Sequence, residues 1–170
     1  MSKPRQRSAG SKLLTAGVVL YVVAWLVPVF QGQQLLGAGT EWARWLGSSA
    51  SSHAASGPDW LPGWGACRFA WDLLVGDPPS QDEAWKSRVL GSTCLTNLLM
   101  LAAFAMFVAK KHRAIPGVLL LGCGGLNASW LYLCEQELIE SLRPGYYLWL
   151  LSFVLVGLGA LLQPTAAGKA

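Results

Sequence analysis

The sequence predicts an all-α protein, a four-helix transmembrane bundle with a helical, tryptophan-rich cap formed by its outer loop. Of its 170 residues, 53% are hydrophobic and 13% are charged, whereas soluble domains average roughly 45–50% and 25%. Four long stretches of the chain contain no Asp, Glu, Lys or Arg. Stretches of this kind are expected to lie in a bilayer, where they do not meet water.

Each of the four charge-free runs is close to the length that crosses a membrane. At 1.5 Å per residue, runs of this length approach the roughly 30 Å thickness of a hydrocarbon core. We therefore predict transmembrane helices at residues 13–30, 89–109, 115–134 and 146–162.

The first run also fits a secretory signal peptide, because four basic residues precede it. Its 18 apolar residues exceed the roughly 7–15 of a signal core, and no small-x-small cleavage site follows. These two features favour a retained membrane anchor.

The basic residues predict the orientation, because Lys and Arg in short loops stay on the cytoplasmic side. In a four-span chain, residues 1–12, 110–114 and 163–170 share one side, with eight Lys or Arg and no acid. Residues 31–88 and 135–145 share the other side, with all nine Asp and Glu. Both termini are therefore expected in the cytoplasm, and the protein in the cell inner membrane. A net charge of +4 without a clustered basic face does not predict a nucleic-acid partner.

The outer loop at residues 31–88 contains six of the nine tryptophans. The other three lie near the outer ends of predicted spans, and they are Trp25, Trp130 and Trp149. Indole rings favour the headgroup region of a bilayer, so one interpretation is an aromatic belt. The other interpretation is a docking platform, because a belt normally has two rims and these residues lie on one side. The candidate partner-binding residues are Trp60, Trp64, Trp71 and Trp85.

Amphipathic helices are predicted within this loop. A short helix is expected at 41–46, followed by a flexible linker rich in Ser, Ala and Gly at 47–57. Beyond it, apolar residues recur at i, i+3, i+7 and i+10, which predicts a helix that packs this stripe against the bundle. The stripe consists of Trp64, Cys67, Trp71 and Leu74. Residues 77–79 (Asp-Pro-Pro) end this helix, and a second helix at 80–88 leads into the next span.

Three of the four cysteines lie toward the outer side, which is oxidising in a bacterium. A disulfide between two of them is possible, although the sequence does not choose the pair. They are Cys67, Cys94 and Cys134. The alternative is that all are small buried hydrophobic residues. The chain has no C-x-x-C, and His53 and His112 fall on opposite sides, so no metal site and no cofactor are predicted.

Two amide side chains lie inside the predicted spans. Asn97 and Asn127 are expected at a similar depth, roughly 10–12 Å below the outer surface, and to pair across their helices. The pair is interpreted as a packing contact of about 0.6 kcal/mol, or as a polar pocket for a quinone-like molecule or a lipid headgroup. No acid or base lies within a span, which argues against an ion-coupled transporter. Glycines expected to allow close helix packing are Gly122, Gly124, Gly125, Gly157 and Gly159.

Two segments carry a resemblance. Residues 61–64 (Leu-Pro-Gly-Trp) and 143–150 (Arg-Pro-Gly-Tyr-Tyr-Leu-Trp-Leu) resemble segments of small, uncharacterised bacterial inner-membrane proteins with four spans. The resemblance implies an inner-membrane location and no particular activity. The chain is also similar in size and topology to the four-helix, quinone-linked disulfide oxidases, but it lacks their C-x-x-C.

These observations predict a non-enzymatic accessory or scaffold subunit, which binds the lipid bilayer and another membrane protein or a second copy of itself. One alternative is a membrane thiol-redox or quinone-interacting enzyme that uses Cys67 with Cys94 or Cys134. A second alternative is a small lipid or solute carrier, with Arg68 or Arg143 as the contact for an anionic headgroup.

Overall fold

The computed structural model describes residues 9–31, 44–45, 48, 60–77, 81, 84–108, 114–133 and 136–163. Predictions for the two ends of the chain, the 47–57 linker, most of the 41–46 helix and the cytoplasmic loop at 110–114 therefore lie largely outside the described residues. Within the described residues the fold is mostly helical, as predicted, with one small sheet.

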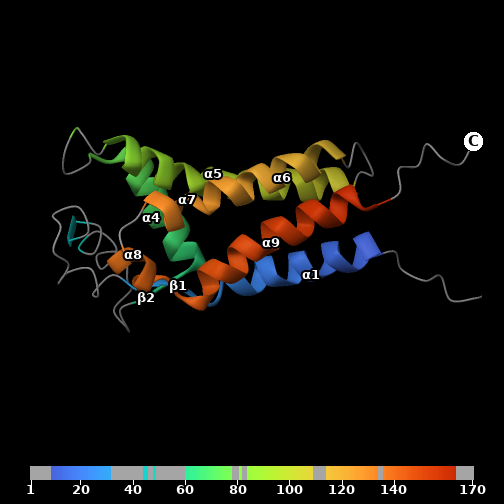
Figure 1. Ribbon diagram of the computed structural model, residues 1–170, viewed down its shortest axis with the longest axis horizontal. Coiled ribbons are helices and arrows are strands. Elements are labelled where there is room, and N and C mark those ends of the chain that lie inside the picture. Colours follow the sequence, from blue (N-terminus) through green and yellow to red (C-terminus); the bar gives the residue numbers. More distant parts are fainter. Residues whose placement is uncertain are drawn as a thin grey trace, which may run out of the picture.

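Four helices run side by side along the long axis of the molecule (Figure 1): α1 (Ala9–Ala24), α5 (Ala84–Val108), α6 (Ala114–Asn127) and α9 (Pro144–Leu161). Helix α9 packs against both α1 and α6, and α6 packs against α5. The helices alternate in direction, so the start of α1 and the end of α9 lie at one end of the bundle. We call the opposite end, where α4, α8 and the sheet lie, the cap end.

Three helical segments are long and apolar enough to cross a membrane, and they coincide closely with three of the predicted runs. They are Ala84–Phe107, Ala114–Leu133 and Pro144–Leu161. Their length and composition are those of a membrane protein.

The first predicted span differs from the structure. Helix α1 has 16 residues and ends at Ala24, whereas the sequence predicted a helix to Phe30. In the turn that follows the helix, the N–H of Leu26 donates to Val23 O at 3.0 Å. Pro28 stops the helix from continuing, because it has no N–H to donate and disfavours helical geometry at the preceding residue, Val27.

A two-stranded antiparallel sheet follows, which the all-α prediction did not include. Strand β1 (Pro28–Gln31) pairs with β2 (Trp60–Pro62), and Phe30 lies opposite Leu61. Both of these side chains are buried. The sheet therefore holds the start of the outer loop beside residues 60–62, in the middle of the same loop.

Helix α4 (Gly63–Val75) crosses the cap end and packs against α5 (Figure 1). A Cβ added to Gly91 of α5 would lie 2.4 Å from the Leu74 backbone nitrogen, so the two helices touch through their backbones. The helix ends at Val75, just before the predicted stop at residues 77–79, and the N–H of Gly76 donates to Asp72 O at 2.7 Å.

The buried face of α4 is not the predicted one. Phe69, Ala70 and Leu73 are buried, while Trp64 and Trp71 are about half exposed. Periodicity locates a stripe only approximately, and here two overlapping stripes were available. Phe69 and its buried neighbours pack against the protein. Of the predicted stripe, Trp64 and Trp71 face outward, whereas Cys67 and Leu74 are partly buried.

The third predicted span is two helices, α6 and α7 (Ser129–Leu133), separated at Ala128. The N–H of Leu131 bonds to Ala128 O, so the carbonyl of Asn127 is released from the helical ladder. The hydroxyl of Tyr146 donates to this carbonyl at 2.7 Å. A side chain inserted into the ladder is a known cause of helix kinks and accounts for the break.

Candidate functional site

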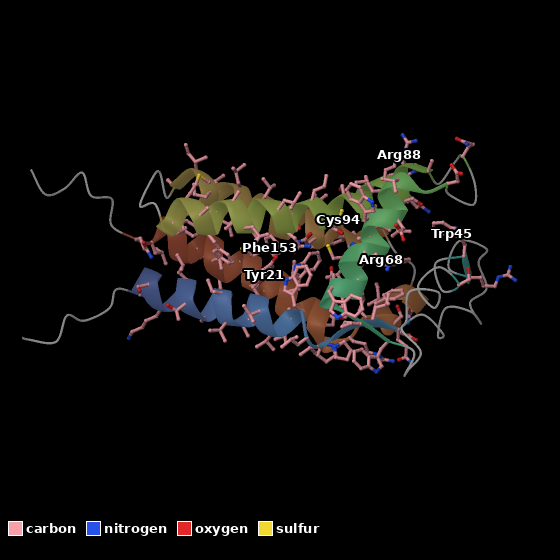
Figure 2. The ribbon with its side chains drawn as sticks, turned by 180° about the vertical axis from the view of Figure 1, so that it is seen from behind. Tyr21, Trp45, Arg68, Arg88, Cys94 and Phe153 are labelled. Carbon is pink, nitrogen blue, oxygen red and sulfur yellow. The ribbon has the colours of Figure 1, made fainter. Side chains whose placement is uncertain are left out.

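A cavity of about 50 Å³ lies beneath α4. Its walls come from α4, β1, α7, the ends of α1 and α9 that face the cap, and the middle of α5. Figure 2 shows Cys94 on α5 where α4 crosses it. The polar or sulfur-containing residues of the lining include Cys67, Thr93, Cys94 and Asn97, and most of the remainder is apolar or aromatic. We call this space the α4 cavity.

Asn97 is the centre of a hydrogen-bond network in the wall of the α4 cavity. Its Oδ1 accepts from Tyr21 OH and from Trp149 Nε1, each at 3.0 Å. Its Nδ2 donates to Cys67 Sγ at 3.6 Å. An indole N–H can only donate, so Trp149 determines which end of the amide is the oxygen. The network joins α1, α4, α5 and α9.

Asn127 is fully buried in a second network. Its Oδ1 accepts from Thr96 Oγ1 at 3.1 Å, and its backbone carbonyl accepts from Tyr146. Its Nδ2 has no hydrogen-bond partner within the described part of the chain. Asn97 and Asn127 thus belong to separate networks, which meet at the neighbouring residues Thr96 and Asn97 of α5.

Cys67 and Cys94 both line the α4 cavity, and both are free thiols, as is Cys123. Cys134 lies outside the described residues, so a disulfide that includes it stays a prediction. Burial raises the pKa of the Cys67 thiol above 9.0, against the opposing effect of the Asn97 hydrogen bond. A thiol with a raised pKa is protonated at neutral pH and is a weak nucleophile.

The described residues contain no group of three or more His, Cys, Asp or Glu that could hold a metal ion. The charged side chains that the structure describes lie mostly toward the cap end. Figure 2 shows Arg68 on α4 and Arg88 on α5, with Arg88 directed away from the bundle. Arg143, the other candidate anion contact, donates from Nη2 to Gln31 Oε1.

The candidate partner-binding tryptophans lie on the outside of the cap end. Trp64 is 52% exposed, Trp71 49% and Trp85 52%. Trp60, on β2, is only partly exposed. Along α4, Trp64, Arg68, Trp71 and Val75 form one exposed face, which we call the tryptophan face.

Sequence reasoning missed most of the groups that hold Asn97. Trp149 was assigned to an aromatic belt, yet its indole N–H points to Asn97. Tyr21 drew no prediction. Its position in the middle of an apolar run was the available signal, because a buried tyrosine hydroxyl usually finds a partner.

Comparisons of the chain with protein-family models, curated proteins and solved structures give no match. The resemblance carried by residues 61–64 and 143–150 therefore stays a prediction.

Proposed function

We propose that the protein is a four-span membrane protein that acts as a non-enzymatic accessory or scaffold subunit. In this proposal the tryptophan face and Trp85 bind another membrane protein or a second copy of the chain. The observation that carries it is the exposure of three large indole rings on α4 and the start of α5. Tryptophan is enriched among the residues that dominate protein interfaces.

The test of the interface is site-specific photo-crosslinking in the native membrane. Benzoylphenylalanine at position 71 is expected to give a discrete protein adduct. The matched control is the same residue at position 98, where Leu98 is exposed on the predicted spanning part of α5 and should meet only lipid. Lipid adducts alone at both positions would show that the tryptophans form a membrane belt.

The proposal includes α1 as a fourth span, with both termini in the cytoplasm. It is supported by the packing of α1 along α9 and by the alternating directions of the four long helices. A backbone of 16 helical residues covers about 24 Å, and the extended residues of β1 add to that length.

Topology is tested with single cysteines placed in a variant without native cysteines. Ala9→Cys and Gln163→Cys should react with an impermeant maleimide only after the membrane is permeabilised. Asp77→Cys, at the cap end, should react in intact cells. Opposite accessibility of Ala9→Cys and Gln163→Cys would contradict a four-span arrangement.

A second candidate function is thiol-redox chemistry, favoured by the position of Cys67 and Cys94 in one cavity. The raised pKa of Cys67 opposes it, because the thiolate is the reactive form. Non-reducing mass spectrometry of protein from the native membrane distinguishes the scaffold function from the thiol-redox function. A disulfide between Cys67 and Cys94 supports the redox function, and four free thiols contradict it.

A further inference from the structure

We propose that the α4 cavity binds the end of a hydrocarbon chain, supplied as an acyl chain by a lipid of the bilayer, with α4 as its cover. This goes beyond the scaffold role, which uses the opposite, outward face of the same helix. The argument rests on the size, chemistry and depth of the cavity.

Size limits what can enter. One water needs roughly 10–15 Å³ of such space, and an engineered cavity that binds benzene measures about 150 Å³. A volume of about 50 Å³ is therefore more than one water needs and too small for an aromatic ring. The space suits something narrower than a quinone headgroup.

The lining excludes a charged occupant. None of the described residues that form the wall has a charged side chain, and an unpaired charge in an apolar space costs several kcal/mol or more. The lining also offers too few hydrogen-bond partners for several water molecules, because each water needs two to four polar partners. The Oδ1 of Asn97 and the indole N–H groups of Trp130 and Trp149 already take part in hydrogen bonds. An alkyl chain needs no such partners.

The depth of the α4 cavity indicates that the hydrocarbon chain comes from a lipid of the bilayer. Cys94 and Asn97 lie in the middle of α5, inside a segment long and apolar enough to cross a membrane, and Trp149 lies inside another. In the proposed spanning arrangement this part of the cavity wall lies at the depth of acyl chains, and the space is only partly enclosed. Phe69 and Ala66 of α4 close it from the cap end.

The test uses the full-length protein in nanodiscs of phosphatidylethanolamine and phosphatidylglycerol with a phosphatidylcholine probe that carries a diazirine in its acyl chain. After illumination, mass spectrometry is expected to find label on cavity residues of α4 such as Ala66 and Phe69. Ala66→Phe should reduce that label by about tenfold, because a ring fills a space that close-packed interiors cannot enlarge cheaply. The matched control, Ala105→Phe, makes the same change at an exposed position of α5 and should leave the label unchanged.

Two outcomes would overturn the proposal. One is the absence of label from the cavity residues while exposed residues such as Leu98 are labelled. The other is equal cavity labelling in wild type and Ala66→Phe. If Ala66→Phe does not fold, Ala66→Leu fills less of the space and is expected to give an intermediate reduction, and unchanged labelling there would contradict the proposal. Crosslinking at Trp71 reports on the scaffold role separately, because that side chain faces away from the cavity.

Discussion

The described residues form two hydrophobic cores, which differ in how they are built. The inner core lies between the long helices and contains Tyr21, Met100, Ala103, Leu120, Cys123, Phe153 and Val156. The outer core lies at the cap end and contains Val29, Phe30, Leu61, Phe69, Leu73, Leu90, Trp130, Leu142 and Tyr146. Figure 2 shows Tyr21 and Phe153 in the middle of the bundle, and Trp149 packs against both cores.

In the inner half of the molecule, away from the cap end, α9 makes close backbone contacts with its neighbours. A Cβ on Gly159 would lie 2.6 Å from the Leu14 nitrogen of α1, and one on Gly157 would lie 3.0 Å from the Gly117 carbonyl of α6. Helix α9 thus touches both neighbours through glycines. Lipid tails are as apolar as leucine, so membrane helices associate through such close packing rather than through the hydrophobic effect.

The outer half depends on aromatic side chains and hydrogen bonds. The rings of Phe30 and Phe69 stack with their centroids 5.7 Å apart. The ring centroid of Trp130 lies 6.4 Å from that of Phe30 and 6.5 Å from that of Phe69. Trp130 Nε1 also donates to Thr93 Oγ1 at 3.3 Å. The comparison teaches that close backbone contacts at glycines occur in both halves, because Gly91 of α5 meets α4 in the same way. The outer half adds a stacked ring pair and a two-stranded sheet.

The largest expected effect comes from breaking the outer core at Phe69. Phe69→Ala removes a buried ring between Phe30 and Trp130 and should lower the free energy of unfolding by about 3–5 kcal/mol. Hydrogen exchange should accelerate in α4 and the sheet more than in α9. The control, Trp71→Ala, removes a half-exposed ring from the same helix and should change stability by about 0.5 kcal/mol or less. Equal losses would mean that the tryptophan stripe also packs against the protein.

The spanning helices were predicted well from the sequence, whereas the buried face of α4 was not. Charge-free runs locate α5, the α6–α7 segment and α9 closely, because spanning helices are specified by composition over many residues. The face of α4 was mispredicted because two apolar stripes share one helix, and only the surrounding surface decides between Phe69 and Trp71.

A second large effect is expected at Asn97, where the two halves meet. Asn97→Leu leaves Tyr21 OH and Trp149 Nε1 without the acceptor they share. An unsatisfied buried donor costs roughly 1–3 kcal/mol, so the variant should lose about 2–4 kcal/mol in a denaturation measurement.

The matched control is Asn127→Leu. Its Nδ2 has no partner among the described residues. The single hydroxyl proton of Thr96 has Thr93 O, at 2.6 Å, as an alternative acceptor, so it is not left unpaired in the variant. This variant should lose about 1 kcal/mol or less. A larger loss at Asn127 than at Asn97 would contradict the assignment of Asn97 as the centre of the network.

The inner half is tested at Gly159. Gly159→Ala places a methyl group against the α1 backbone and should cost about 1–3 kcal/mol, because the helices must separate. Gly122→Ala is the control, since a Cβ there has nothing within 4 Å, and alanine favours a helix over glycine by about 0.5–1 kcal/mol. Thermal unfolding should therefore shift in opposite directions, and two similar destabilisations would contradict glycine packing as the basis of this half.

The site was harder to predict from the sequence than the fold. Asn97 and Asn127 were found because an amide is conspicuous in an apolar run. The partners of Asn97 were not found. A tryptophan at a helix end, such as Trp149, is typical of a membrane belt whether its indole N–H faces a lipid headgroup or an amide. The break at Ala128 depends on Tyr146, a residue on another helix, and no local pattern in the chain reports it.

The smallest expected effect comes from a variant that changes the hydrogen bond at the break between α6 and α7 and leaves the packing around it intact. Tyr146→Phe keeps the ring in the outer core and removes only the hydroxyl that donates to Asn127 O. The loss should be about 1 kcal/mol, the usual net contribution of one hydrogen bond, because the freed carbonyl can accept again from Leu131 N–H as in a continuous helix. Slower exchange of the Leu131 amide in the variant would be the signature of that repair. Tyr147→Phe, the same change at an exposed neighbour, should affect neither quantity, and unchanged exchange at Leu131 in both variants would show that something other than Tyr146 holds the break open.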